Sequence, residues 1–403
     1  MILDQLTIIW TLMLILMSCS SSIIAVSQNN NKVIYVPRDY PTIRDAINHA
    51  TENTIIVVSE GTYTETIRIK GKHGLVIKGS GKVVIKRETL LKKQLGIIIS
   101  GSKNIVLENI IVEGSIKAVL IDSSHDITLR NLTIKSSLSG IYIEDSDWIN
   151  ITDSQIAGSP YVVRIDNARY IRIYNNTIIG RNYCPPQTRV SACTVETDTA
   201  TGIALYNVSN AEVINNTILA GKKGIAISRS YNVVIENNTL TDNINTNIYV
   251  IDSQNVTIVK NILKEAISTL TIGYSYNVNI WLNYIGGYFD ITGSQINWYT
   301  PEKIHYMYKG KLYYNHLCNY WFKYSGRDKN GDGIGDKPYN TGQGYDNYPL
   351  IEPPWKYTIV EQSRGKEHRQ TIQIYPLHLL IAVVSSIIGF TIVIISLKRR
   401  RGK

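Results

Sequence analysis

The chain has 403 residues, of which 44% are hydrophobic and 18% charged, with 27 tyrosines against 3 phenylalanines. This composition excludes a disordered chain and a small disulfide-stapled scaffold. The formal net charge is +10, but five basic residues lie within positions 398–403, so the charge is weak evidence for nucleic-acid binding and we predict none.

Both ends of the chain carry apolar segments. Residues 1–27 are predicted to form a signal peptide, because an apolar stretch at 6–17 precedes the small residues at 25–27. No basic residue precedes that stretch, so an uncleaved membrane span is the alternative. Residues 377–397 contain no Asp, Glu, Lys or Arg and could cross a hydrocarbon core of about 30 Å as one transmembrane helix. The basic tail at 398–403 then predicts a single-pass cell-membrane protein with its N-terminal part outside and its tail in the cytoplasm.

Residues 28–95 are expected to form an N-terminal cap and the first coils of a repeat. An apolar alternation at 33–37 predicts a strand, and Pro41 suits the first turn of a short helix after it. Such a helix would cover the open end of a repeating structure, where strand edges otherwise lack partners.

Residues 96–295 repeat with a period of about 22 residues. Within each repeat, apolar and polar side chains alternate with period two, which indicates a short strand with one buried face. Because no helix separates the strands, the constant period predicts a parallel β-helix whose coils stack about 4.8 Å apart. The equivalent strand positions are Ile105, Ile127, Ile149, Ile171, Ala211, Val233, Val256 and Val278.

One step of the repeat is longer than the others, which predicts a loop insertion at 180–201. Cys184 and Cys193 lie in this loop, and a local disulfide between them is expected in an oxidising compartment. Cys318 is left over as a free thiol, an intermolecular bridge or a ligand.

Asparagine recurs at one turn of the repeat and predicts a structural ladder. Asn tolerates left-handed turn geometry, and stacked amides can hydrogen-bond from coil to coil. Several of these asparagines also begin Asn-x-Ser/Thr sequons, so the chain could be a glycoprotein, although a buried ladder could not carry sugar. The ladder consists of Asn109, Asn131, Asn175, Asn215 and Asn237.

Two groups of segments carry a family resemblance. Residues 35–47 (YVPRDYPTIRDAI) and 55–65 (IIVVSEGTYTE) resemble the opening of right-handed β-helix proteins of the carbohydrate-binding and sugar-hydrolysis, or pectin-lyase-like, group. Residues 319–321, 328–339 and 346–350 resemble the C-terminal end of NosD-like β-helix proteins. The resemblance implies an all-β fold, a right-handed parallel β-helix of about 22-residue coils with an N-terminal helical cap. To this fold we add the C-terminal transmembrane helix.

Residues 296–354 are expected to form a C-terminal cap with an Asp-rich loop, followed by a stalk at 355–376. The loop places Asp328, Asn330 and Asp332 at alternate positions with glycines for a sharp turn, which is the spacing that calcium prefers. Asp336 or Asp346 could complete the shell. The alternative is an Asp/Gly-rich surface turn without an ion.

The coil register brings together a second group of carboxylates. Asp122, Glu144 and Asp166 are 22 residues apart, so they should stack on successive coils, where they could hold a cation or supply the acid and base of a glycosidase. The alternative is that they are turn residues at a solvated corner, where Asp is common.

A third group mixes imidazole, thioether and thiol side chains. Soft ligands of this kind suit copper, and the NosD resemblance makes copper worth considering. The alternative is a Tyr-rich cap over the last coil. The residues concerned are His305, Met307, His316 and Cys318.

Aromatic side chains give a final indication. Trp148 and Tyr170 occupy equivalent positions of adjacent coils, and aromatic faces can stack on sugar rings. By resemblance, we expect a membrane-anchored extracytoplasmic protein that binds a cell-surface or extracellular polysaccharide, or a surface protein. Two alternatives stay open: a polysaccharide lyase or glycoside hydrolase acting at Asp122, Glu144 and Asp166, and a copper-handling accessory protein.

Overall fold

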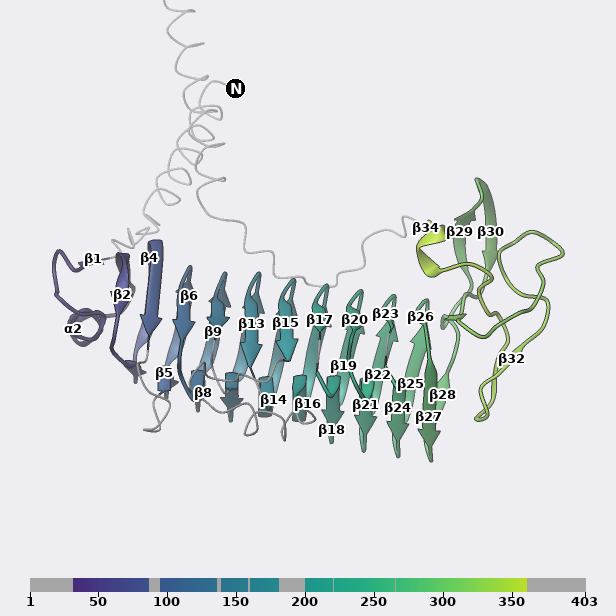
Figure 1. The fold of residues 1–403 in the computed structure, drawn as a ribbon, viewed down its shortest axis with the longest axis horizontal. Coiled ribbons are helices and arrows are strands. Elements are labelled where there is room, and N and C mark those ends of the chain that lie inside the picture. The colour runs from purple at the N-terminus through teal and green to yellow at the C-terminus, as the bar shows by residue number, and fades with distance from the viewer. Residues whose placement is uncertain are drawn as a thin grey trace, which may run out of the picture. The chain divides into compact units, whose positions relative to one another are not determined.

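The computed structural model of the protein describes residues 32–86, 95–135, 139–158, 160–180, 200–219, 221–264 and 266–360. Parallel strands stack from β1 to β28 along one axis, and three strand segments make up a typical coil (Figure 1). Equivalent segments of successive coils pair with one another, so the coils build three parallel sheets, which we call faces A, B and C.

Face A consists of β3 (Ile67–Lys70), β5 (Leu95–Ser100), β8 (Lys117–Asp122), β11 (Ser139–Glu144), the first halves of β14 (Tyr161–Tyr174) and β16 (Thr201–Ile214), β18 (Lys223–Ser228), β21 (Thr246–Ile251), β24 (Ser268–Gly273) and β27 (Tyr288–Thr292). Face B consists of β1 (Lys32–Val36), β2 (Thr54–Tyr63), β4 (His73–Lys86), β6 (Lys103–Glu108), β9 (His125–Arg130), β12 (Asp147–Thr152), the second halves of β14 and β16, β19 (Tyr231–Glu236), β22 (Gln254–Val259), β25 (Tyr276–Trp281) and β28 (Ile296–Asn297). Face C begins with the ends of β2 and β4 and continues through β7 (Ile111–Glu113), β10 (Thr133–Lys135), β13 (Gln155–Gly158), β15 (Thr177–Gly180), β17 (Thr217–Leu219), β20 (Thr239–Thr241), β23 (Ile262–Leu263), β26 (Tyr284–Ile285) and β31 (Tyr320–Trp321).

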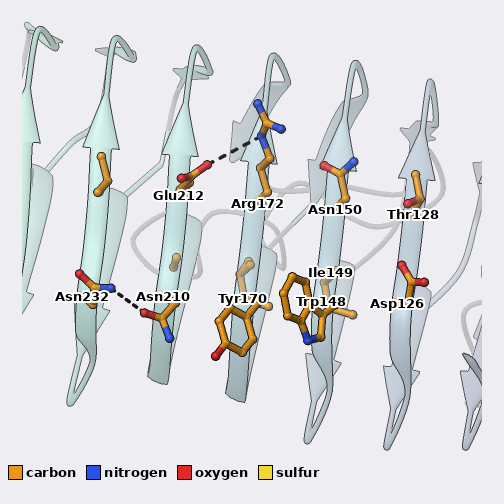
Figure 2. A pocket seen from close by; sticks show the side chains of 13 residues that line it. Asp126, Thr128, Trp148, Ile149, Asn150, Tyr170, Arg172, Asn210, Glu212 and Asn232 are labelled. Atoms are coloured by element: carbon orange, nitrogen blue, oxygen red, sulfur yellow. Dashed lines mark hydrogen bonds and ion pairs between the residues drawn. The ribbon is translucent and has the colours of Figure 1, made fainter. Parts of the chain in front are cut away.

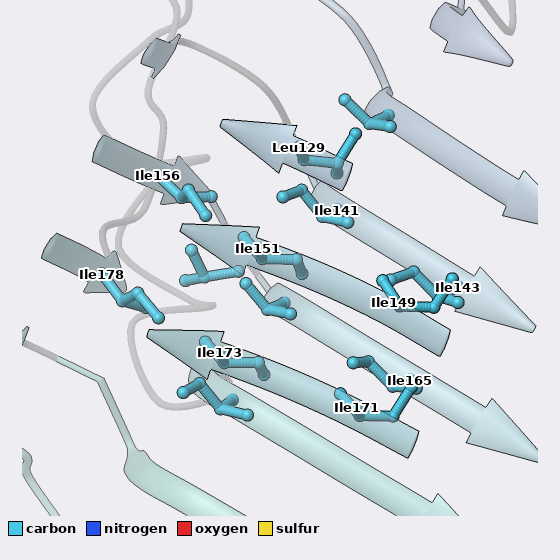
Figure 3. Close-up of a cluster of buried hydrophobic side chains, with 14 of the residues drawn as sticks. Leu129, Ile141, Ile143, Ile149, Ile151, Ile156, Ile165, Ile171, Ile173 and Ile178 are labelled. Carbon is cyan, nitrogen blue, oxygen red and sulfur yellow. The ribbon is translucent and has the colours of Figure 1, made fainter. Parts of the chain in front are cut away.

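The register of the sheets follows the predicted repeat. On face B, Ile127 pairs with Ile105 of the preceding coil and Ile149 of the next. Identical β-branched side chains therefore stack inside the solenoid, as the close-up of the core shows (Figure 3). Burying one such side chain stabilises the fold by about 1.5–3 kcal/mol. Repeated over the coils, these columns form one continuous hydrophobic core.

Two asparagine ladders run along the turn between faces B and C. The predicted column is exposed and lies in the left-handed region, with Asn131 donating to Asn109 at 2.7 Å and Asn237 to Asn215 at 2.6 Å. The residue that follows each member of this column points inward. From Asn176 onward, this inward residue is a buried asparagine. The buried ladder consists of Asn176, Asn216, Asn238, Asn261, Asn283 and Asn319.

The N-terminal cap contains the predicted helix, α2 (Ile43–His49). Thr42 is its N-cap, and its hydroxyl accepts the backbone N–H of Asp45 at 3.0 Å. The carboxylate of Glu65 accepts the backbone N–H groups of Ile43 and Arg44 at 2.9 and 3.0 Å. These bonds satisfy the free N–H groups of the first turn, while the apolar face of the helix is buried against the first coil.

The C-terminal cap contains two small antiparallel elements. Strands β29 (Ile304–Tyr308), β30 (Lys311–Asn315) and β34 (Tyr357–Val360) form one sheet in the order β30-β29-β34, and β32 (Tyr339–Asn340) pairs with β33 (Tyr345–Asp346). The predicted stalk at 355–376 therefore begins too early, because η1 (Pro354–Lys356) and β34 belong to the cap. Tyr357 fixes this segment: its hydroxyl is buried and donates to the carbonyl of Gly333 at 2.6 Å.

The predicted fold class needs one correction. It included a C-terminal transmembrane helix, whereas no helix within the described residues is long and apolar enough to cross a membrane. The α-helix of the described residues is α2 in the N-terminal cap, which has seven residues and is only about 10 Å long. The segment 377–397, the signal peptide at 1–27, the tail at 398–403 and the Cys184–Cys193 pair lie outside the described residues. The described residues thus form an all-β parallel β-helix with one short α-helix.

Candidate functional site

Asp122, Glu144 and Asp166 lie on three successive strands of face A. Glu144 pairs with Asp122 on one side and with Asp166 on the other. Asp166 is only 8% exposed, and Arg164 Nε donates to its two carboxylate oxygens at 3.1 and 2.9 Å. The hydroxyl of Tyr142 donates to the same carboxylate at 3.0 Å. The column is therefore one ion pair beside two partly exposed carboxylates, and its acid–base role stays a prediction.

Tyr142 is partly buried beside this ion pair. Burial, followed by the hydrogen bond to Asp166, raises the pKa of Tyr142 to about 12, so the hydroxyl remains a donor at neutral pH. The ammonium of Lys117 lies 3.7 Å from the centre of the Tyr142 ring. Within the described ranges, no three His, Cys, Asp or Glu side chains are grouped so that they could hold a metal ion.

The four residues of the predicted calcium loop lie on one turn of the C-terminal cap. The carboxylate of Asp328 accepts the backbone N–H groups of residues 331, 332 and 333 at 2.7, 3.1 and 2.9 Å. Asp332 accepts the N–H of residue 334 at 2.8 Å and the side-chain amide of Asn330 at 3.0 Å, and Asp336 accepts the N–H of residue 329 at 3.2 Å. The carboxylates therefore fix the backbone of the turn, and calcium binding by the loop stays a prediction.

Tyrosine hydroxyls hold this turn against the rest of the cap. Tyr313 and Tyr357 donate to the carbonyls of Gly331 and Gly333, both at 2.6 Å. Tyr306 donates to the carbonyl of residue 332 at 2.9 Å. A Tyr-rich cap thus follows from the need to satisfy the carbonyls of an irregular turn.

The four residues considered as copper ligands do not form one group. His305 and Met307 lie on β29, while His316 Nδ1 is 2.8 Å from the carbonyl oxygen of Thr300. Cys318 is fully buried, and no metal-holding group of His, Cys, Asp or Glu side chains is found in the described residues. These residues therefore do not fit a shared copper site.

Cys318 belongs instead to a buried network around Asp346. Trp321 Nε1 donates to Asp346 Oδ2 at 2.6 Å, and the backbone N–H groups of Asn319 and Tyr348 donate to the carboxylate at 3.3 and 3.0 Å. The thiol of Cys318 also donates to it, and burial raises the pKa of that thiol well above its usual range. Burial raises the pKa of Asp346 to about 6 despite these donors. Asp346 is therefore a structural group of the cap.

Stability is expected to fall as the pH rises from about 4 to about 6. The folded protein holds a proton on Asp346 up to pH of about 6, whereas the unfolded chain releases it near its usual pKa of 3.8. Since the folded state binds more protons in this window, its free energy of unfolding should decrease by about 3 kcal/mol across it. Urea unfolding followed by tryptophan fluorescence at pH 4 to 7 measures this, because Trp321 contacts the carboxylate. Asp346→Asn should flatten the profile, and an unchanged fall in that variant would assign it to another group.

The turn between faces A and B contains two residues with positive φ in each coil from Gly101 to Asn277. At the second of these positions φ lies between +51° and +59°, a region that suits Asn and Asp but strains bulky side chains. Most members of this turn column are indeed Asn or Asp, and the exceptions are Trp148 and Tyr170. The column consists of Asn104, Asp126, Trp148, Tyr170, Asn210, Asn232, Asn255 and Asn277.

Trp148 and Tyr170 form an exposed aromatic pair. Their rings are stacked with centroids 4.3 Å apart and an interplanar angle of 16°, and 47% and 43% of the two residues remain exposed. Two bulky aromatics thus occupy left-handed positions while they remain half-exposed. Four other large side chains of the solenoid also have positive φ, Arg229, Lys260, Tyr274 and Leu282, but none of them is stacked on a second aromatic ring of the same turn column. Strain of this kind persists at functional sites, where another interaction selects it.

The aromatic pair borders a cavity of about 470 Å³ on face B (Figure 2). Polar side chains from neighbouring strands surround the pair, and Arg172 Nε lies 3.9 Å from a carboxylate oxygen of Glu212. Asn150 Oδ1 is buried and has no hydrogen-bond partner among the described residues. An aromatic surface beside charged groups and an unsatisfied acceptor is suited to a ligand with both apolar and hydroxyl-bearing faces. Further polar lining residues are Asp126, Thr128, Asn210 and Asn232.

The sequence pointed to this pair only through its register. The 22-residue period shows that Trp148 and Tyr170 are equivalent. It does not show that their position has a left-handed backbone and is occupied by Asn or Asp in the six other coils of the column. The charged members Arg172 and Glu212 could have been found as outward-facing positions on the same strands, one position after the buried Ile171 and Ala211.

Comparisons with known proteins agree with this architecture. A family model described as "Right handed beta helix region" matches residues 117–296, and one described as "Periplasmic copper-binding protein (NosD)" matches residues 16–188. No curated protein matches the sequence. The fold and these matches define a parallel β-solenoid with an aromatic cavity on one face. The chain is a right-handed β-helix protein, and its resemblance to the NosD-like and pectin-lyase-like group is confirmed.

Several solved structures are similar to the chain. An alginate lyase from Paenibacillus sp. str. FPU-7 is 15% identical over 66% of this chain and 99% of that one, with a TM-score of 0.46. A pectate lyase is 12% identical over 66% of this chain and 78% of that one, with a TM-score of 0.40. A periplasmic alginate epimerase is 13% identical over 65% of this chain and 83% of that one, with a TM-score of 0.38.

Proposed function

We propose that the protein binds a carbohydrate outside the cytoplasm through the aromatic pair Trp148 and Tyr170. The single observation that carries the proposal is the position of these two residues, since strained backbone and exposed rings coincide at one cavity. A location outside the cytoplasm is supported by the NosD family model, whose description is periplasmic.

The chemistry of the cavity supports a sugar ligand. One face of a sugar ring carries C–H groups, which pack on aromatic rings, while its hydroxyl groups need donors and acceptors at the edge. Arg172 and Glu212 supply charged partners, and the side chains of Thr128 and Asn210 supply further polar groups at the cavity. Arg172 and Glu212 lie in near contact and Asp126 adds a second carboxylate, so the cavity as a whole favours a neutral sugar over an acidic one.

Replacing either aromatic residue should weaken binding by about tenfold or more, because each ring contributes stacking as well as buried area. A glycan array with the full-length protein would identify the sugar, and calorimetric titration of the best oligosaccharide would compare Trp148→Ala and Tyr170→Ala with the unmodified protein. Tyr276→Ala is the matched control, because Tyr276 is 61% exposed on the same face and does not line the cavity.

Two results would contradict this proposal in different ways. A blank array would leave a protein partner or a scaffold role as the function. Full affinity in Trp148→Ala and Tyr170→Ala, with sugar binding intact, would move the site elsewhere on the solenoid.

A further inference from the structure

A second hollow lies on face A and extends from the last coil of the carboxylate column, which carries Asp166, to the coil of Tyr249. Its floor is formed by Ala204 and Ala226, which occupy an outward-facing column where the preceding coils carry Tyr142 and Arg164 and the following coil carries Tyr249. Two small side chains between large ones leave a cavity of about 440 Å³. A second cavity of about 490 Å³ adjoins it, because Lys223 and Tyr249 line both.

Among the described residues, the charges around this hollow do not balance. Three cations, Arg164, Lys222 and Lys223, line the first cavity against one carboxylate, Asp166. That carboxylate is already bound by Arg164 at 2.9 Å. Among the residues that the structure describes, no carboxylate forms an ion pair with Lys222 or Lys223.

Lys223 packs on an aromatic ring at the edge of this hollow. The residue is partly buried, and its ammonium lies 3.5 Å from the centre of the Tyr249 ring. Burial, followed by repulsion from Lys222, lowers the pKa of Lys223. A cation that is partly removed from water and lacks a counter-ion is stabilised by any anionic group that reaches it.

We infer that the hollow over Ala204 and Ala226 binds the oxyanion of an acidic saccharide, a carboxylate or a sulfate, through Lys222 and Lys223. Tyr161 and Tyr206 border the same cavity and give a ring-shaped ligand apolar contacts beside the charge. In the adjoining cavity Asp290 is the acidic residue, so we place the anionic group on the Ala204 side of Lys223. This site is on a different face from the aromatic pair, and the inference does not rest on the proposed function.

The test compares three probes on the full-length protein: a hexamer of a uronic acid, a sulfated hexasaccharide and a neutral hexasaccharide. Calorimetric titration should show that at least one acidic probe binds about tenfold more tightly than the neutral one, with an affinity that falls as salt is added. Binding of both acidic probes would indicate a general oxyanion site, and binding of one alone would identify the group. Equal affinity for all three probes would overturn the inference.

Two substitutions place the site. Lys223→Met keeps the approximate length of the side chain and removes its charge. Ala226→Glu puts a competing carboxylate on the floor of the cavity. Each substitution should weaken the binding of the acidic probe by about tenfold or more. Lys103→Gln is the control, since Lys103 is an exposed lysine at the start of a face B strand. If Trp148→Ala abolishes binding of the acidic probe while Lys223→Met and Ala226→Glu leave it unchanged, the probe binds at the aromatic pair and the inference is wrong. Neutral-sugar binding should not change in Lys223→Met, so the two sites fail separately.

Discussion

Replacing Asn238 by alanine should destabilise the protein by about 3–5 kcal/mol, the largest effect expected of a single polar substitution here. The side chain is fully buried, and its Nδ2 donates to the carbonyls of Val213 and Glu236 at 2.8 and 3.0 Å and to Asn261 Oδ1 at 3.0 Å. Its oxygen accepts the backbone and side-chain N–H groups of Asn216 at 2.8 and 3.0 Å. Alanine would remove all five bonds at once, and the buried backbone N–H of Asn216 would lose its acceptor. Asn261 Oδ1, Asn216 Nδ2 and the carbonyl of Glu236 would each keep another bond.

The neighbouring residue is the control for this prediction. Asn237 belongs to the exposed ladder and donates one side-chain bond, to Asn215 at 2.6 Å. Asn237→Ala should cost about 1.5–2.5 kcal/mol, from that bond and from the left-handed backbone. Urea unfolding of the two variants measures the difference. Equal losses would mean that the inward-facing column is not the structural one.

These two adjacent columns show how far the sequence determines the fold. Period-two alternation at a constant 22-residue spacing predicts the stacked strands, because a slip of one residue would expose a whole apolar face. It does not separate the two asparagine columns, since both contain amides at the same spacing. The separation comes from backbone geometry: the first residue turns the chain with a positive φ, and the second therefore points into the core.

The sites depend on contacts between residues that are distant in the sequence. The register correctly stacks Asp122, Glu144 and Asp166, but it cannot show that Arg164 binds the last of them. The C-terminal cap has no repeat, so Cys318 could not be assigned to the network of Asp346, 28 positions away. Proximity in the sequence instead grouped it with His316, whose ring is bound to a backbone carbonyl.

Replacing the aromatic pair by asparagine should make the protein more stable while it abolishes sugar binding. Trp148 and Tyr170 have φ values of +59° and +58°, which cost about 1–2 kcal/mol each for an ordinary side chain and much less for Asn. The double variant Trp148→Asn, Tyr170→Asn also allows amide bonds along the turn column, like the one that Asn232 donates to Asn210. It loses the ring stacking, which contributes about 0.5–1.5 kcal/mol. The free energy of unfolding should therefore rise by about 1–2 kcal/mol, as expected where function opposes stability.

Three further variants separate strain from binding. Trp148→Ala removes the ring but keeps a side chain for which the left-handed turn is strained, so it should be less stable than Trp148→Asn while both lose the sugar. Tyr276→Asn lies outside the left-handed positions, so it should neither stabilise the protein nor change binding. Urea unfolding and calorimetric titration of the same preparations give both quantities. If the asparagine double variant were less stable than the unmodified protein, the two rings would be there for packing, and their strained position would no longer indicate a ligand.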